Sequence, residues 1–152
     1  MTLENLLAIH KLQRFDANAA GVRRLLAAAE RNLTDAGIAA LSAENRFDAA
    51  YKAIMQCAMI SLWANGYRTS TSQPGHHQTA LQALPKTLLL AQERVILLDA
   101  LRKQRNLNDY EGDPVSDGVV EECCKQAALL LAETRAWLET NRPDLLHSEN
   151  QS

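Results

Sequence analysis

The fold is decided by the stretch from Val119 to Leu138, VVEECCKQAALLLAETRAWL, in which apolar residues return every three or four positions. That spacing gathers the apolar side chains on one face of a helix. Ser116 stands just before the pattern, and its hydroxyl can cap the first turn. We therefore predict a long amphipathic helix that buries one side against other helices.

Two further helical patterns come earlier in the chain. After a short amphipathic segment at Leu3 to Leu12, apolar residues form a helical stripe from Val22 to Ala40. Ser42 can then cap a second helix, whose buried face runs from Phe47 to Leu62 and which ends at Asn65-Gly66.

A loop and another helix fill the middle of the chain. The segment from Tyr67 to Gly75 lacks periodicity and contains Thr, Ser, Pro and Gly, which is typical of a loop. A short helix from His76 to Leu84 follows, and Pro85 can open a third long helix at its first turn. The core face expected for this third helix comprises Leu88, Leu89, Val95, Leu98 and Leu101.

No run of alternating strand residues is recognisable, so the expected fold class is all-α: an antiparallel, up-and-down bundle of four to five helices. We expect a single domain over residues 1–145 and a disordered polar tail over residues 146–152. Leucine and alanine exceed what such a bundle needs to close its core, which favours a homodimer.

Composition limits the function classes. The 152 residues are 47% hydrophobic, enough for one domain with its own core. A net charge of −2 excludes a protein that attracts nucleic acid over its whole surface, so any contact with RNA has to be local. No segment reaches eighteen apolar residues and the N-terminus lacks a signal-peptide pattern, so we expect a cytoplasmic protein without a membrane segment.

The three cysteines, Cys57, Cys123 and Cys124, lie inside apolar periodic segments and lack the paired spacing of a zinc site. Reduced thiols in the core are the expected state. We expect neither a metal nor a cofactor.

A polar cluster, RKQRNLNDYEG from Arg102 to Gly112, ends the third helical pattern. On a helix, Arg102 and Arg105 share one face while Asn106 and Tyr110 form a pair beside them. Arginines held in this way suit a phosphate.

A purely structural explanation of the same cluster is also open. Arg105 and Asp109 can form an ion pair at a solvated helix end, and such pairs stabilise little. Gly112 then lies past the end of the helix in the left-handed conformation, and Pro114 prevents continuation. The two explanations are compatible.

The cluster resembles the signature of the HEPN family (higher eukaryotes and prokaryotes nucleotide-binding). Arg105-Asn106 matches the start of the family motif, and Asp109-Tyr110 stands where catalytic members carry a histidine, as in a bacterial branch of the family. Gly66-Tyr67-Arg68 and Pro74-Gly75-His76-His77 resemble the loop between the second and third helices of such proteins. The likeness covers roughly Asn45 to Leu138.

The resemblance implies a helical bundle, a homodimer with the arginine motifs near its interface, and metal-independent endoribonuclease activity in catalytic members. Arg105, Asn106 and Tyr110 would occupy the catalytic positions, and Arg102 with Arg105 would bind phosphate. A tyrosine has an ordinary pKa of ~10 where a histidine has ~6.5, so Tyr110 is a poor base at neutral pH. We therefore expect binding of RNA or a nucleotide, with catalysis weak or lost.

His76 and His77 form a second candidate site in the loop. If a straight helix ran from Pro85 to Arg105, its ~1.5 Å rise per residue would set these histidines on the order of 30 Å from the arginines. We therefore expect them at the opposite end of the subunit, anchoring the loop rather than replacing the missing base.

Two other functions stay open. One is an active ribonuclease of the toxin type, in which Tyr110 or a histidine of a partner moves the proton. The other is a helper or antitoxin without enzymatic activity, which resembles HEPN proteins that pair with a minimal nucleotidyltransferase.

Overall fold

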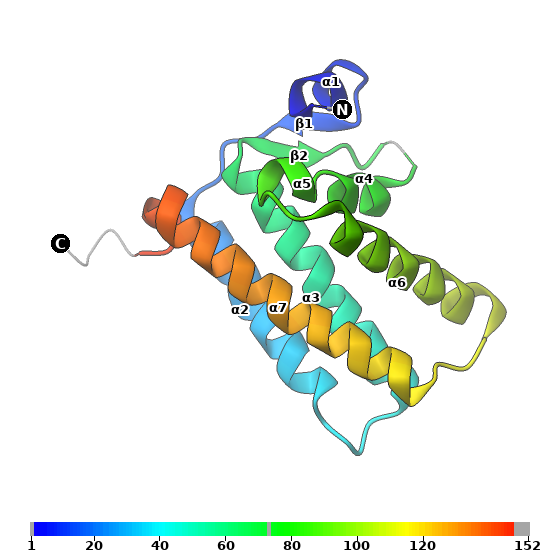
Figure 1. The fold of residues 1–152 in the computed structure, drawn as a ribbon. Helices are drawn as coiled ribbons and strands as arrows, with labels where there is room; N and C mark the ends of the chain where they lie inside the picture. The colour runs from blue at the N-terminus through cyan, green and yellow to red at the C-terminus, as the bar shows by residue number, and fades with distance from the viewer. Residues whose placement is uncertain (1, 73, 148–152) are drawn as a thin grey trace.

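Three long helices pack side by side and a fourth lies along their edge, and the computed structural model describes residues 2–72 and 74–147 of this arrangement (Figure 1). The all-α fold class is confirmed. In chain order the elements are α1 (Leu3–Ala8), β1 (Leu12–Arg14), α2 (Ala19–Ala36), α3 (Ala43–Ala64), β2 (Tyr67–Thr69), α4 (His76–Gln82), α5 (Leu84–Thr87), α6 (Gln92–Glu111), α7 (Asp117–Asn141) and the 3-10 turn η1 (Pro143–Leu145).

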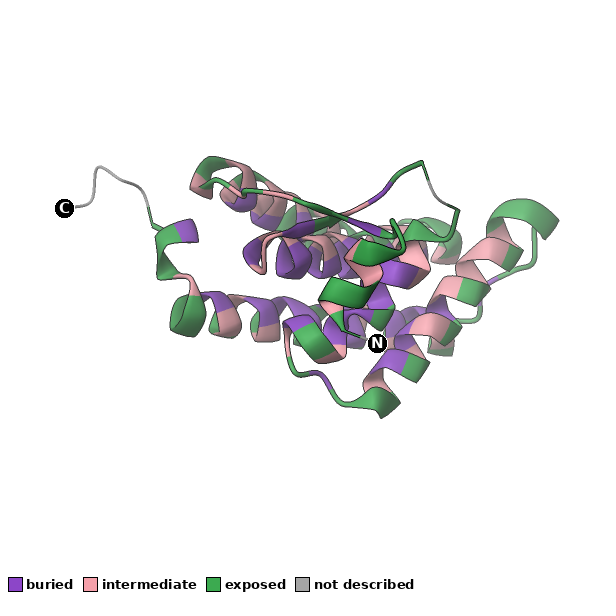
Figure 2. Ribbon diagram, turned by 90° about the horizontal axis from the view of Figure 1, so that it is seen from above, coloured by how far each residue is buried: buried purple, intermediate pink, exposed green. Residues whose placement is uncertain are grey.

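Helix α3 is the centre of the core, because it packs against α2 and α7 and also against α4, α5 and α6. Its side chains are buried on nearly all sides, among them Phe47, Ile54 and Leu62. Helices α2 and α7 bury one face each, and the buried residues gather where the helices face one another (Figure 2). The amphipathic helix predicted from the VVEECC stretch is confirmed as α7.

The predicted helix starts at Ser42 and Ser116 are confirmed by their caps. The hydroxyl of Ser42 accepts a hydrogen bond from the backbone N–H of Asn45 at 3.1 Å, and that of Ser116 accepts one from Val119 at 3.2 Å. Gly112 ends α6 with φ 71° and ψ 19°, in the left-handed region that glycine adopts without a Cβ penalty.

The expectation of a chain without strands was wrong in one place. Residues Leu12–Arg14 and Tyr67–Thr69 form a two-stranded antiparallel sheet, with Leu12 opposite Thr69 and Arg14 opposite Tyr67. Each strand has only three residues, too few to show an alternating pattern, and the partners lie far apart in the sequence. The sheet fixes the start of the segment that leads into α4.

The third long helix does not begin at Pro85. That proline lies in the short helix α5, and the chain leaves helical geometry at Leu88 before α6 begins at Gln92. Leu89 adopts a left-handed φ of 58° and is 82% exposed, so it does not belong to the core face on which it was predicted. A left-handed residue interrupts the helix and lets the chain reverse direction.

The end of the chain is folded as far as the structure describes it. Leu145 is buried, and the imidazole Nε2 of His147 lies 3.2 Å from the carboxylate of Glu139. Residues 148–152, most of the predicted tail, lie outside the described residues. Within the described ranges there is no helix with the length and apolar character needed to cross a membrane.

Candidate functional site

The arginine cluster and the two histidines line the same cavity. Its volume is about 260 Å³, and it opens between the start of α4 and the second half of α6. The residues that line it are Gly75, His76, His77, Gln78, Arg102, Arg105, Asn106 and Tyr110. The structure thus brings together every residue that the sequence singled out as a candidate.

The predicted separation of roughly 30 Å between His76, His77 and the arginines was therefore wrong. It assumed one straight helix from Pro85. Instead, α4 and α5 carry the chain away from the histidines, the chain turns at Leu89, and α6 runs back antiparallel along α4 (Figure 1). Gln82 at the end of α4 consequently lies beside the first half of α6, and His76 at its start lies beside the second half.

Arg105 is held between two carboxylates and an aromatic ring. Its Nε lies 3.3 Å from Oδ2 of Asp109 and 3.7 Å from Oδ1 of Asp48, and its guanidinium carbon is 5.4 Å from the centre of the Tyr51 ring. The Nε–H group is buried, yet neither carboxylate lies where it could accept a hydrogen bond from it. An unsatisfied buried donor costs stability, and such groups are few in folded proteins.

Arg102 is held more firmly. Its Nε donates a 2.7 Å hydrogen bond to Oδ1 of Asp99, one turn earlier on α6. Among the described residues, the terminal nitrogens of Arg102 and Arg105 enter no hydrogen bond. Arg102 is thus anchored by the hydrogen bond from its Nε, and Arg105 is held by its two carboxylate neighbours and the Tyr51 ring. The terminal N–H groups of both arginines are left for a ligand.

His77 and Tyr51 form a second layer behind the arginines. The Tyr51 hydroxyl and Nδ1 of His77 are 3.2 Å apart. Burial raises the pKa of Tyr51 to about 12, although nearby Arg105 and Arg102 oppose the shift. The pKa of His77 is lowered, first by burial and then by the positive charges of His76, Arg105 and Arg102.

These shifts determine the charge state of the pair at neutral pH. The phenol keeps its proton, and His77 is neutral because its pKa lies below the ordinary value of ~6.5. If Nδ1 donates to the Tyr51 oxygen, Nε2 has a free lone pair and can accept a proton. If the phenol donates to Nδ1, Nε2 carries the hydrogen and acts as a donor.

Tyr110 and Asn106 line the α6 side of the cavity. Tyr110 is 85% exposed, so its ring is free to stack on a planar ligand. Asn106 is half-buried, one turn before it. The catalytic roles assigned to these residues stay predictions, since the geometry establishes only that they share the cavity with Arg105.

Tyr51 was not among the site residues predicted from the sequence. It is almost fully buried, but its hydroxyl reaches His77 and its ring lies under Arg105. A signal was present, because Tyr51 follows Asp48 by three residues on α3 and therefore shares its face. Asp48 on the same face also reaches the arginine end, since its Oδ1 lies 3.7 Å from Nε of Arg105.

Metal and thiol chemistry find little support in the part of the chain that the structure describes. No three His, Cys, Asp or Glu side chains gather there in a group that could hold a metal ion. Cys57 and Cys123 are buried, and burial raises the pKa of each thiol to about 12. Both thiols are therefore protonated, as expected of core cysteines.

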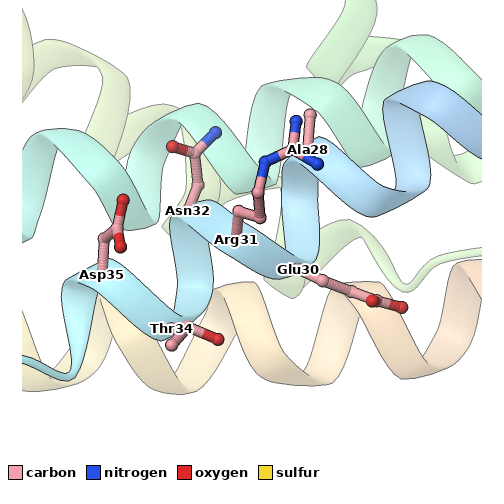
Figure 3. Close-up of a pocket in the computed structure, with 6 residues that line it drawn as sticks. All are labelled: Ala28, Glu30, Arg31, Asn32, Thr34 and Asp35. Atoms are coloured by element: carbon pink, nitrogen blue, oxygen red, sulfur yellow. The ribbon is translucent and has the colours of Figure 1, made fainter.

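A larger hollow of about 420 Å³ lies on the outer surface of α2 and is lined by Ala28, Glu30, Arg31, Asn32, Thr34 and Asp35 (Figure 3). These side chains spread to different sides of the helix instead of converging on one point. Two of them already serve the fold, because Asn32 donates to Gln56 at 2.9 Å and Glu30 pairs with Arg135. The smaller cavity is therefore the better candidate site.

Comparison with known proteins adds no relative. No protein-family model matches this sequence, and no curated protein matches it. The function is therefore argued from the geometry of the cavity.

Proposed function

We propose that the cavity between α4 and α6 binds a phosphate group of RNA, with Arg102 and Arg105 as the groups that contact it. One observation carries this proposal: both guanidinium groups are held in place beside a cavity that two histidines also line. Arg102 is held by a hydrogen bond from its Nε, and Arg105 is held by two carboxylates and the Tyr51 ring. Anchored guanidinium groups lose little conformational entropy when they bind, and their N–H groups match the geometry of phosphate oxygens.

The size and charge of the cavity define the ligand further. About 260 Å³ accommodates a phosphate with its ribose but no large cofactor. Asp48, Asp99 and Asp109 lie close to the arginines and to Lys103, so the local formal charge is near zero. Binding would then depend on directed hydrogen bonds to one or two phosphates, and not on a wide basic surface.

The exposed ring of Tyr110 supports RNA over free phosphate, because unpaired bases of RNA stack on such rings. The resemblance of the Arg105-Asn106 motif to the HEPN signature favours the same ligand. A nucleotide would use the same phosphate contacts.

Cleavage of the bound RNA is a second candidate function, and the position of His76 and His77 favours it. Neutral His77 would take the proton of a ribose 2′-hydroxyl, and the 2′-oxygen would attack the adjacent phosphorus. The bond from phosphorus to the 5′-oxygen would break, and His76 would act as the general acid that gives that oxygen its proton. Arg105 would stabilise the phosphorane charge, and the products would be a 2′,3′-cyclic phosphate and a 5′-hydroxyl.

Fluorescence anisotropy with a labelled single-stranded RNA of mixed sequence, in EDTA, tests the binding proposal. Arg102→Ala and Arg105→Ala should each weaken binding about tenfold or more, since a charged hydrogen bond contributes roughly 1.5 to 3 kcal/mol. Arg31→Ala is the matched control, because Arg31 is an exposed arginine on α2. Equal loss in all three variants, or no loss in any, would contradict the proposal.

The same reactions, followed on a denaturing gel, decide between binding and cleavage. His77→Gln should abolish cleavage and leave RNA binding within about threefold, because the amide cannot take up a proton at neutral pH. Cleavage that persists in His77→Gln but disappears in Tyr110→Phe would move the proton transfer to the phenol. Binding without cleavage in the wild type would leave the binding function alone.

A further inference from the structure

The outward face of α6 carries an unusual stripe. Glu93, Ile96, Ala100, Lys103 and Leu107 are all exposed, and they follow one another at alternating intervals of three and four residues. Val95, Leu98 and Leu101 occupy the opposite face and are buried. Intervals of three and four residues produce the seam along which two helices pack in a coiled coil. We call these five positions the α6 seam.

The α6 seam of one copy is complementary in charge and size to the α6 seam of a second copy that runs in the opposite direction. Suppose a second copy of α6 lies against the first in the opposite direction, with the twofold axis at the level of Leu98. Glu93 of each copy then faces Lys103 of the other, and large Ile96 faces small Ala100. With ~1.5 Å per residue, Glu93 and Lys103 lie about 15 Å apart along one helix, so two ion pairs flank an apolar centre.

The charged ends of the seam are available for such pairing. Glu93 enters no ion pair among the described residues. Lys103 is 69% exposed, and its contact with Asp99 is a long one of 3.6 Å. Exposed lysine side chains reorient readily, so this contact does not oppose a better partner.

A groove beside the seam can receive an apolar side chain. It has a volume of about 330 Å³ and is lined by residues that include Val95, Ile96 and Ala100, with Gln82 of α4 on its far side. Ile96 is 63% exposed, which is costly for an isoleucine in water. The register that sets Ile96 against Ala100 directs it toward this groove in the second copy.

Leu89 provides an independent observation. It projects into solvent immediately before α6, in the left-handed conformation that leucine adopts only at a cost. In the antiparallel arrangement, the end of α6 that follows Leu89 faces the end of the second copy that carries exposed Leu107. Strained and exposed apolar residues persist where the surroundings require them.

We infer that two copies of this chain associate through the α6 seam in antiparallel register. The inference does not rest on the proposed RNA binding. It gives an interface to the homodimer expected from composition, and this interface differs from the one that the HEPN resemblance implies, in which the arginine motifs lie near the interface. The two arginine cavities stay open in this arrangement, because Arg102 and Arg105 point away from the seam, toward α4 and α3.

Sedimentation velocity of the full chain over a range of concentrations tests the inference. The wild type should be a dimer. Ile96→Asp should raise the dimer dissociation constant at least about tenfold, because two apolar contacts are replaced by two buried charges. Leu129→Asp is the matched control, since Leu129 is an exposed leucine on α7 and should not affect association.

A charge exchange tests the register itself. Glu93→Lys and Lys103→Glu should each weaken self-association, because every dimer then holds two pairs of like charge. An equimolar mixture of the two variants should recover the wild-type dimer, since each copy again meets the opposite charge. A monomeric wild type, or a mixture no tighter than either variant alone, would overturn the inference.

Discussion

Tyr51 and His77 show how the environment of single residues sets the chemistry of this cavity. Twenty-six positions separate them, yet a 3.2 Å contact joins the phenol to the imidazole. Burial disfavours charge on both groups, and Arg102 and Arg105 further disfavour a positive charge on His77. Tyr51 and His77 are therefore both neutral at neutral pH, although the two permanent cations Arg102 and Arg105 lie beside them.

The lowered pKa of His77 predicts how stability depends on pH. At a pH between the ordinary histidine pKa of ~6.5 and the lower pKa of the folded state, His77 is protonated in the unfolded chain but not in the folded chain. The contribution of His77 to the free energy of unfolding is therefore complete above about pH 6.5 and declines as the pH falls toward the folded pKa. Urea unfolding of the wild type and of His77→Gln should differ progressively less as the pH is lowered. A difference that grows on acidification would contradict the assignment.

The left-handed backbone at Leu89 should make a glycine variant more stable than an alanine variant. Leu89→Gly and Leu89→Ala remove the same exposed side chain, but only glycine relieves the left-handed conformation. The glycine variant should exceed the alanine variant by about 1 kcal/mol in the free energy of unfolding, measured at low protein concentration. Equal stability would mean that this backbone position is not strained. Both variants should weaken the dimer that we infer.

At the scale of elements, α7 stabilises the bundle through one face only. Leu130 is 0% exposed and Leu129 is 43% exposed, although they are neighbours in the sequence. Leu130→Ala should lower the free energy of unfolding by about 2 to 5 kcal/mol, and Leu129→Ala should change it by less than about 0.5 kcal/mol. Chemical denaturation of both variants checks the difference. Similar losses would mean that α7 is rotated relative to the described packing.

The elements differ in how far the sequence predicts them. Ser42, Ser116 and Gly112 mark helix ends through interactions within one turn, so their roles could be predicted from local sequence. Leu89 carries no turn signal, because leucine is a good helix former and its left-handed conformation depends on the surrounding fold. Because the turn at Leu89 was not predicted, the predicted start of α6 was wrong. The predicted distance between the histidines and the arginines was therefore too large.

At the scale of the whole molecule, the candidate site could be predicted only in part, because it combines side chains from segments far apart in the sequence. Arg102, Arg105, Asn106 and Tyr110 could be grouped from helical periodicity alone, because they belong to one helix. The contributions of His77 and Tyr51 require the antiparallel packing of α4 on α6 and the position of α3 beneath both. Local patterns do not encode such contacts between distant segments.

The overall charge of the molecule predicts the salt dependence of RNA binding. Each phosphate neutralised on a single strand contributes a slope of about −0.7 to the logarithm of the binding constant against the logarithm of salt concentration. The protein carries a net charge of −2, and of the described residues that line the cavity only Arg102 and Arg105 are arginines, whose terminal nitrogens form no hydrogen bond. We therefore expect a shallow slope between about −1 and −2, measured by anisotropy titrations at several salt concentrations.

Arg105→Ala should reduce this slope by about 0.7, while Arg31→Ala should leave it unchanged. A slope steeper than about −4 would mean that many more cations contact the strand than the cavity provides. RNA would then bind to a wider surface, and the cavity between α4 and α6 would not be the main phosphate site. A shallow slope that depends on Arg105 requires the opposite conclusion: an acidic protein binds RNA through a few directed contacts, and its specificity comes from the shape of the cavity.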